Sequence, residues 1–581
     1  MRNSTISLVP VYEKRYTSSM LSRCCLFALL AGTCLAQDAA RMDQIVQSYV
    51  ANHQFMGTAL VARGSQVLYS KGFGSANLEW DIPNSPNTKF RLGSVTKQFT
   101  AASILLLEER GKLKVSDPVK KYMPDAPTAW DKITISNVLT HTSGIPNFTS
   151  FPDYAKFGVL ATTPTELVAR FRDKPLDFEP GEKYSYSNSG YVLLTYLLEK
   201  ITGDTYEKFV RDNLFTPLGM KDSGYDSNSA VIAHRASGYV SGPKGFENAG
   251  FVHMTVPQGA GALYSTTEDL LKWEQGLFGG KVLQAASLEK MTTPFKSNYA
   301  FGLMVTTEGG HKLIAHGGGI QGFNTELEYF PEDKLTVVVL GNVNGRAPGE
   351  IAKKLAAMAH GDNVKLQSER KEITLDPKVL SRYVGAYQMP QGQANLITLE
   401  GNQLTSKLGN QAPVPIFPES ETMFFLKVVD AQVEFSGNDA QGRPTQLTIH
   451  QNGMDNTGKR LDDAEAKKVA DAAAAVAKRF KDQTAAPGSE AALRKMIEDC
   501  QAGKPDYDSM SAGLATATRQ QLPQIQAILT EHGKIQSVTF TGVGPAGPDI
   551  YQVKFEKGTL EYRIWLSPDG KAEASNFHPV Q

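Results

Sequence analysis

Ser94 and Lys97 are the two side chains in this chain whose types and spacing best suit covalent chemistry. Residues three apart on a helix lie on one face, and the apolar residues after Ser94 recur at helical spacing until Gly111. A serine hydroxyl is a weak nucleophile until a neighbouring base takes its proton. The pair therefore predicts a serine nucleophile near the start of a helix, with a lysine amine and the helix dipole beside it.

The same Ser-x-x-Lys spacing recurs at Ser241, Ser287 and Ser368, so the pair is weak evidence on its own. A second motif strengthens the interpretation. Tyr186 and Asn188 form the only Tyr-x-Asn in the sequence and lie in a turn-rich stretch that runs into apolar residues. This stretch predicts a loop before a helix. It offers a phenol that can exchange a proton and an amide that can donate and accept hydrogen bonds.

A third motif is the run of three glycines after His316, between two apolar, strand-like stretches at 313–315 and 323–329. Glycine beside a strand lets another backbone approach closely, so this run is a candidate for contact with a substrate. Taken alone, the run is more typical of a glycine-rich hairpin turn.

In this order the three motifs resemble those of the penicillin-recognising serine hydrolases, which include class C β-lactamases, D,D-peptidases and related esterases. The resemblance extends from Met42 to Asn344 and includes framework-like segments at 139–146, 217–220 and 261–270. It implies an α+β catalytic domain of the β-lactamase/transpeptidase type, in which an antiparallel sheet flanked by helices meets an all-α subdomain. The active site is then expected in the cleft between these two parts.

The resemblance also implies a role for each motif residue. The implied catalytic residues are Ser94 as nucleophile, Lys97 as its partner and Tyr186 as general base and acid. The implied substrate-binding residues are Asn188, His316, Gly318 and Gly319, with the N–H groups of Ser94 and Gly319 forming the oxyanion hole. The resemblance implies no metal and no cofactor.

Tyr186 and Lys97 are expected to titrate as a coupled pair. Free tyrosine and lysine side chains have pKa values of about 10 and about 10.4, so neither is a good base at neutral pH. Packed together, the ammonium would lower the pKa of the phenol, while burial would lower that of the amine. His141, in the first framework segment, is interpreted as a structural residue or a neighbour of the catalytic residues.

One departure from the family pattern bears on the substrate. Class C β-lactamases and many D,D-peptidases carry Lys-Thr/Ser-Gly where this chain has His316 followed by glycines. Histidine is mostly neutral at pH 7, so it attracts a substrate carboxylate less than lysine does. We therefore expect an esterase or a D-amino-acid-type peptidase, with a β-lactamase or D,D-carboxypeptidase as the alternative. A non-catalytic acyl sensor or cell-wall-binding protein is the alternative of another class.

Other chemistries find little support in the sequence. No serine lies in Gly-x-Ser-x-Gly and no His-Glu-x-x-His occurs, which argues against an α/β-hydrolase and a zinc protease. Residues 453–459 imitate a P-loop, but Arg460 stands where a Mg²⁺-binding Ser or Thr is needed, so this segment is interpreted as a turn. Basic and acidic residues are equal in number, 60 of each, which gives no basis for binding nucleic acid.

The first 36 residues have the basic start and short apolar core of a secretory signal peptide. Cleavage after Ala36 would leave Cys500 as the only cysteine, so no disulfide could form within the mature chain. We expect an exported protein, periplasmic or secreted, without a transmembrane span in its mature form. Its partner would be a small-molecule or peptide substrate, and its oligomeric state is left open.

At 581 residues the chain predicts several domains. After the signal peptide at 1–36, we expect a serine hydrolase domain at 37–362, a lipocalin-like β-barrel at 371–456 and a small α+β module of the cystatin or NTF2-like kind at 461–581. In the first domain, strands are expected at 57–61, 66–71 and 335–340 and flanking helices at 42–53 and 350–360. In the second, strands are expected at 396–399, 424–427 and 446–449. In the third, helices are expected at 464–480, 490–502 and 516–532 and strands at 536–542, 549–555 and 560–566.

Overall fold

The computed structural model describes residues 38–581 except 243–244, 391, 452–453, 568 and 581. The chain divides into two compact units between Val364 and Lys365. The signal peptide expected at 1–36 lies outside the described residues. Within the described part of the chain, no helix is both long enough and apolar enough to cross a membrane.

A six-stranded antiparallel sheet forms the centre of the first unit, with strand order β10-β11-β12-β13-β1-β2. Its strands are β1 Gly57–Arg63, β2 Gln66–Phe73, β10 Met304–Glu308, β11 His311–Ile320, β12 Phe323–Phe330 and β13 Leu335–Gly341. The neighbouring inner strands β1 and β13 are buried along almost their whole length, as expected of a sheet covered on both faces. Two helices, α9 (Thr267–Phe278) and α11 (Ala347–His360), pack against these strands, and a further helix covers residues 38–51.

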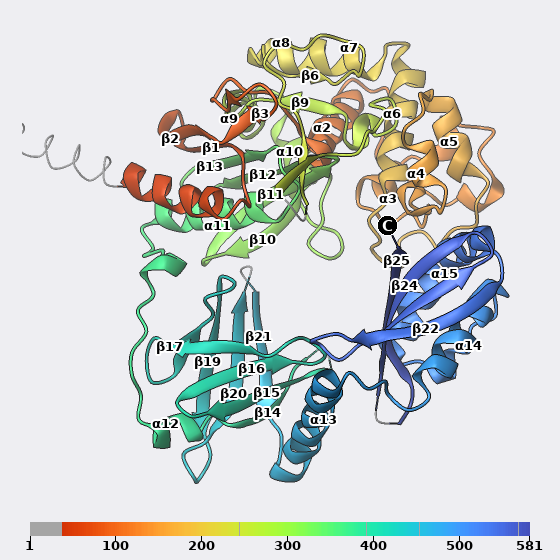
Figure 1. Ribbon diagram of the computed structural model, residues 1–581. Helices are drawn as coiled ribbons and strands as arrows, with labels where there is room; N and C mark the ends of the chain where they lie inside the picture. The colour runs from red at the N-terminus through yellow and green to blue at the C-terminus, as the bar shows by residue number, and fades with distance from the viewer. Residues whose placement is uncertain (1–37, 243–244, 391, 452–453, 568, 581) are drawn as a thin grey trace, which may run out of the picture. The chain divides into compact units, whose positions relative to one another are not determined.

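The remaining elements of this unit are mostly helical (Figure 1). The helices are α2 Thr96–Glu109, α3 Ile135–Leu139, α4 Tyr154–Phe157, α5 Pro164–Arg172, α6 Asn188–Thr202, α7 Tyr206–Val210, α8 Thr216–Leu218 and α10 Ala285–Thr292. Small sheets pair β3 Ser75–Asn77 with β4 Ile82–Pro83, β5 Phe90–Arg91 and β6 Gly224–Tyr225 with β9 Leu263–Ser265, and β7 Tyr239–Gly242 with β8 Gly245–Asn248. Helix α2 is buried from Thr96 to Leu107, so it runs through the core and holds its first turn rigidly.

The second unit begins with a closed barrel of eight antiparallel strands, preceded by the short helix α12 (Pro377–Ser381). The strands are β14 Gly385–Gln388, β15 Ala394–Glu400, β16 Gln403–Leu408, β17 Val414–Pro418, β18 Met423–Phe425, β19 Ala431–Asn438, β20 Pro444–Gln451 and β21 Met454–Arg460. Aromatic and aliphatic side chains such as Tyr387, Phe424 and Phe435 fill the interior, as in other small barrels.

The interpretation of residues 453–459 as a turn is wrong. Met454–Arg460 form β21, which pairs with β20 on one side and with β14 on the other and so closes the barrel. Gly453 itself lies outside the described residues. A barrel without this strand would expose two unpaired edges, so pairing overrides the polar, turn-like composition of the segment.

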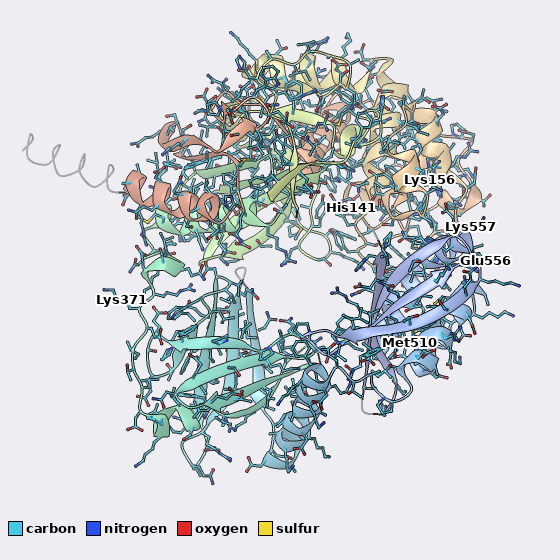
Figure 2. All side chains as sticks on the ribbon, in the orientation of Figure 1. His141, Lys156, Lys371, Met510, Glu556 and Lys557 are labelled. Atoms are coloured by element: carbon cyan, nitrogen blue, oxygen red, sulfur yellow. The ribbon has the colours of Figure 1, made fainter. Side chains whose placement is uncertain are left out.

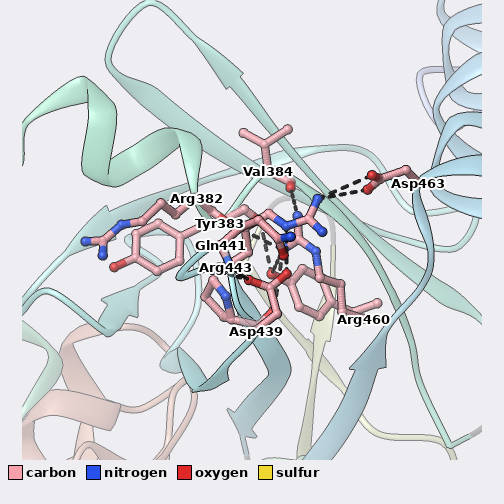
Figure 3. Close-up of polar contacts among 10 residues, drawn as sticks. Arg382, Tyr383, Val384, Asp439, Gln441, Arg443, Arg460 and Asp463 are labelled. Atoms are coloured by element: carbon pink, nitrogen blue, oxygen red, sulfur yellow. Dashed lines mark hydrogen bonds and ion pairs between the residues drawn. The ribbon is translucent and has the colours of Figure 1, made fainter.

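Two arginines stabilise the barrel where its first and last strands meet (Figure 3). Arg460 donates to Tyr387 Oη at 2.8 Å and to the carbonyl of Val384. Arg443 donates to Asp439 at 2.8 Å and to Asp463, the first residue of the following helix, at 3.0 Å. These bonds connect the barrel strands to the residues just before β14 and just after β21.

The chain ends in a small α+β module. Its elements are α13 Asp463–Asp482, α14 Ser489–Gln501, α15 Ala512–His532, β22 Ile535–Val543, β23 Asp549–Phe555, β24 Gly558–Leu566 and β25 Ala572–Pro579. The four strands form one antiparallel sheet in sequence order, and α14 and α15 contact it. Strand β25 was not expected, because residues 572–579 contain no β-branched residue and only one large apolar side chain, Phe577.

Glu274 is a buried carboxyl on α9, 2% exposed, and its Oε2 has no hydrogen-bond partner among the described residues. Burial raises its pKa from 4.5 to about 8. Between pH 4.5 and about 8 the Glu274 carboxyl is therefore protonated in the folded state and ionised in the unfolded state. Its contribution to stability is complete below pH 4.5 and is lost as pH rises past about 8.

We predict that Glu274→Gln leaves the thermal unfolding midpoint at pH 5 nearly unchanged and raises it at pH 9, because the neutral amide need not ionise. Thermal unfolding followed by circular dichroism at both pH values measures this. Glu268→Gln, at an exposed position of the same helix, is the control. An equal shift at both pH values would contradict the account.

Candidate active site

Ser94 lies in the single 3₁₀ turn Gly93–Val95 that leads directly into α2. Gly93 has a φ of +54° and contacts β11 so closely that a Cβ would come within 2.7 Å of Gly319 N. Any other residue would push the strand away from this turn. The turn therefore brings the backbone of Ser94 against the glycine-rich strand.

The Lys97 amine is completely buried, with 0% of the residue exposed. Its Nζ lies 2.9 Å from Asn188 Oδ1, 2.8 Å from the carbonyl oxygen of Ala260 and 3.0 Å from Ser94 Oγ. Burial lowers the pKa of Lys97 well below its usual 10.5. The two carbonyl-type oxygens can only accept hydrogen bonds, so a neutral amine would donate to both and keep its lone pair for the serine.

The Tyr186 hydroxyl donates to Ser94 Oγ at 2.8 Å, so the serine oxygen lies between a phenol and an amine. Burial raises the pKa of Tyr186 above its usual 10. The expectation that the ammonium would lower the pKa of this phenol is therefore wrong. Lys97 Nζ faces the ring of Tyr186, 4.8 Å from its centroid, and desolvation of the phenol outweighs any attraction between the charges.

Asn188 is the first residue of α6 and links the amine to the helical part of the unit. Its Oδ1 accepts from Lys97, its Nδ2 donates to Thr149 Oγ1 at 3.2 Å, and its backbone N–H donates to Asn147 Oδ1 at 3.1 Å. These bonds fix the orientation of the amide, so its oxygen faces the lysine.

The run from His316 to Gly319 lies inside the continuous strand β11, not in a hairpin turn. A Cβ on Gly318 would come within 1.9 Å of Leu92 O, so only glycine fits there. Gly319 lines the same cavity as Ser94. Its backbone N is the atom nearest to a Cβ built on Gly93, so the backbone of Gly319 lies against the turn that holds Ser94.

The His316 side chain is buried, 6% exposed, and is not among the residues that line the cavity. Nδ1 lies 2.6 Å from Gly317 O, which can only accept, so Nδ1 carries the proton and Nε2 accepts from Tyr299 Oη at 2.9 Å. Burial and the nearby lysine lower its pKa to about 4. Both ring nitrogens are therefore occupied, and the residue is neutral near pH 7.

His141, labelled in Figure 2, is buried beside Tyr186, with the two ring centroids 4.3 Å apart. Its Nδ1 accepts a hydrogen bond of 3.2 Å from the backbone N–H of Ser187, the residue that follows the tyrosine. Burial and the nearby Lys97 hold the pKa of His141 well below 6.5. The neutral imidazole thus fixes the backbone next to Tyr186, in agreement with a structural rather than a catalytic interpretation.

A cavity of about 390 Å³ opens beside Ser94. It is lined by Gly93, Ser94, Phe148, Thr149, Tyr154, Asn188, Val252, Pro257, Ala260, Gly261, Gly319, Ile320, Gln321, Asn324 and Asn344. None of these side chains is charged. Sequence reasoning identified only Ser94, Asn188 and Gly319 among them as site residues. The others lie in loops, in α4 and in the strands β11 and β12, and they belong to no motif that indicates a site.

The sequence matches the β-lactamase family over residues 42–361. The chain belongs to the β-lactamase family. A second match, over residues 369–464, is to a domain of unknown function, DUF3471. This β-lactamase-family chain is 32% identical over 429 residues to penicillin-binding protein 4* of Bacillus subtilis (strain 168), covering 69% of this chain and 94% of the relative.

Two further comparisons agree with this assignment. Teichoic acid D-alanine hydrolase of Staphylococcus aureus (strain MRSA252) is 27% identical over 308 residues, covering 52% of this chain and 73% of the relative. The solved structure of an octameric penicillin-binding protein homologue from Pyrococcus abyssi is similar with a TM-score of 0.53 and 26% identity, covering 73% of this chain and all of that one. The predicted membership of the penicillin-recognising serine hydrolases, the fold class and the assignment as a serine hydrolase are confirmed.

We predict that His141→Phe lowers kcat/KM for an ester substrate by roughly 10- to 100-fold, because a small displacement of a reacting group costs that much. The phenyl ring keeps the packing but cannot accept from the N–H of Ser187. Steady-state kinetics with p-nitrophenyl acetate measure the effect.

Ser187→Ala is the matched control for this change. It keeps the backbone N–H, and the Ser187 hydroxyl has no partner among the described residues. We expect nearly normal kinetics from this variant. A His141→Phe protein as active as the parent would show that the imidazole does not position Tyr186.

Proposed function

We propose that this chain is an exported esterase or D-amino-acid-type peptidase that acts through an acyl-enzyme on Ser94. One observation carries the proposal: Ser94 Oγ lies 3.0 Å from the buried amine of Lys97 and 2.8 Å from the Tyr186 hydroxyl, at the edge of an open cavity. A nucleophile next to a base within hydrogen-bond distance is the arrangement that covalent catalysis needs.

Lys97 acts as the base in the first step. Its neutral amine takes the proton of Ser94 while Oγ attacks the substrate carbonyl, and the resulting oxyanion accepts from the N–H groups of Ser94 and Gly319. Each such donor typically contributes about 10²- to 10³-fold to the rate. The raised pKa of Tyr186 keeps its phenol protonated in the free enzyme, which makes it the acid rather than the first base.

Tyr186 gives its proton to the leaving group, and the phenolate that forms is stabilised by the Lys97 ammonium beside its ring. In the second step water attacks the acyl-enzyme and passes a proton to the phenolate. Ser94 then leaves and recovers its proton from Lys97, so both groups return to their starting states. Asn188 and Ala260 hold the amine in place throughout.

The uncharged lining of the cavity supports an ester with a neutral acyl group as the substrate. A β-lactam or a D,D-peptide presents a carboxylate, and among the described residues no cationic side chain lines the cavity to receive it. His316 does not supply the missing charge, since its pKa is about 4. A relative named teichoic acid D-alanine hydrolase supports D-alanyl esters as a second class of ester.

The proposal also includes export of the protein and the boundaries of its domains. The signal peptide would be residues 1–36, the hydrolase domain 37–362, the barrel domain 371–456 and the final module 461–581. The basic start and apolar core of the first segment support export. The alternative of a non-catalytic acyl sensor predicts an acylated Ser94 that does not turn over.

We predict that Ser94→Ala lowers turnover of p-nitrophenyl acetate by at least about 1000-fold, because removing a nucleophile leaves only binding and oxyanion stabilisation. The same panel should contain a D-alanyl ester, a D-aminoacyl anilide and nitrocefin, with both esters turned over fastest. Turnover retained by the alanine variant would refute the assignment of the nucleophile.

Intact-mass measurements over time separate the enzyme from the acyl sensor. The enzyme gains an acyl group and loses it within the turnover time, whereas a sensor stays acylated. Persistent acylation by every ester in the panel would favour the sensor.

We predict that kcat/KM falls as pH decreases through the pKa of Lys97, because the protonated amine cannot accept the serine proton. Since burial holds that pKa well below 10.5, the enzyme should remain active at pH values where a normal lysine is charged. A pH profile of kcat/KM with a neutral ester measures this. A profile that rises only above pH 10.5 would contradict the prediction.

A further inference from the structure

The C-terminal module contains a second cavity, which takes no part in the chemistry at Ser94. It has a volume of about 210 Å³ and lies between α14, α15 and the strands β24 and β25. Its inner end is lined by Ile497, Cys500, Leu529 and Tyr562, all of which are at most 4% exposed. At its outer end lies the exposed Gln521, so the cavity opens between α15 and the edge of the sheet.

The lining indicates the size and charge of a ligand. None of the described residues that line the cavity is charged, and burying an unpaired ion there would cost far more than burying a neutral molecule. An apolar cavity of about 150 Å³ is known to hold benzene, so about 210 Å³ leaves room for one ring and a short substituent.

One polar group in the lining has no partner. The Tyr562 hydroxyl is buried, in a residue 2% exposed, and makes no hydrogen bond within the described part of the chain. Tyr562 lies on the face of β24 that is buried together with Leu560 and Ile564 and so faces the helices. Buried hydroxyls without a partner are uncommon, because each loses its bonds to water without replacement.

The thiol of Cys500 lines the same cavity but makes no hydrogen bond with the Tyr562 hydroxyl. Burial raises the pKa of the thiol to about 11, so it stays neutral, and a thiol is a weak hydrogen-bonding group. The hydroxyl donor of Tyr562 therefore has no acceptor among the described residues.

We propose that this cavity binds a small, uncharged, single-ring molecule with one carbonyl oxygen, which accepts a hydrogen bond from the Tyr562 hydroxyl. The ring occupies the apolar space between the helices and the sheet. The carbonyl satisfies the buried donor, which gives the site its selectivity over plain hydrocarbons of the same shape.

Two probes of nearly equal shape test the proposal on the full chain: acetophenone, which has a carbonyl, and α-methylstyrene, which has a methylene in its place. The Ser94→Ala variant is used, so the catalytic serine cannot add to the carbonyl of acetophenone. Binding is measured by calorimetry and by ligand-observed NMR. We expect saturable binding of both, with acetophenone favoured about tenfold, the usual effect of one hydrogen bond.

Tyr562→Phe should remove this preference and leave the affinity for α-methylstyrene unchanged. Tyr507→Phe, in the same module but outside the cavity, should change neither. Ala517→Trp, which fills the cavity from its half-buried wall, should abolish binding of both probes while ester hydrolysis in the otherwise unchanged enzyme is kept.

Three results would overturn the proposal: neither probe binds saturably, binding survives Ala517→Trp, or Tyr562→Phe weakens both probes equally. Circular dichroism of each variant establishes that the module is folded. Since Tyr562→Phe removes a single oxygen, it tests the proposal even if the tryptophan variant does not fold. The outcome is independent of esterase activity, so failure here leaves the proposed function intact.

Discussion

Burial of the Lys97 amine is the constraint on which the chemistry of the catalytic unit depends. A charged lysine in this position would lose its hydration and meet only neutral oxygens, so the protein favours the uncharged form. Asn188 and Ala260 then take its two N–H groups, and the lone pair faces Ser94. Lysine is a poor base in water because it is protonated at neutral pH. Burial at this position lowers the pKa of Lys97, so its amine can accept a proton.

The close approach of two backbone segments completes this arrangement. Gly93 and Gly318 each occupy a position where a Cβ would collide with the opposite segment, so the turn before α2 and the strand β11 come into direct contact. The rigid core around α2 keeps the turn in place, and the paired strands of the sheet keep β11 in place. Donors fixed in this way need no reorganisation when a negative charge develops.

Much of the active site could be predicted from the sequence, because sequence motifs mark positions where the chemistry needs one particular side chain. Ser94, Lys97, Tyr186 and Asn188 converge as their resemblance to the family implies, and the helical spacing after Ser94 matches α2. The direction of the pKa shift of Tyr186 could not be predicted, since it depends mainly on how deeply the fold buries the phenol.

Other features depend on contacts between segments distant in the sequence. His316 was expected to meet the substrate, but its two nitrogens are held by Tyr299 and Gly317. The strand β21 has a polar composition, and only its pairing with two neighbours makes it a strand. The cavity lined by Tyr562 corresponds to no sequence motif, because its walls are mainly apolar residues of two helices and a sheet.

The most direct test of the account is the pKa of Lys97 itself. The ε-carbons of ¹³C-labelled lysines shift when their amines lose a proton, and comparison with Lys97→Arg assigns the signal. The account predicts that this one signal titrates well below the ordinary value of about 10.4 and that Asn188→Ala changes its midpoint. A Lys97 signal that titrates at or above the ordinary value would contradict the central claim.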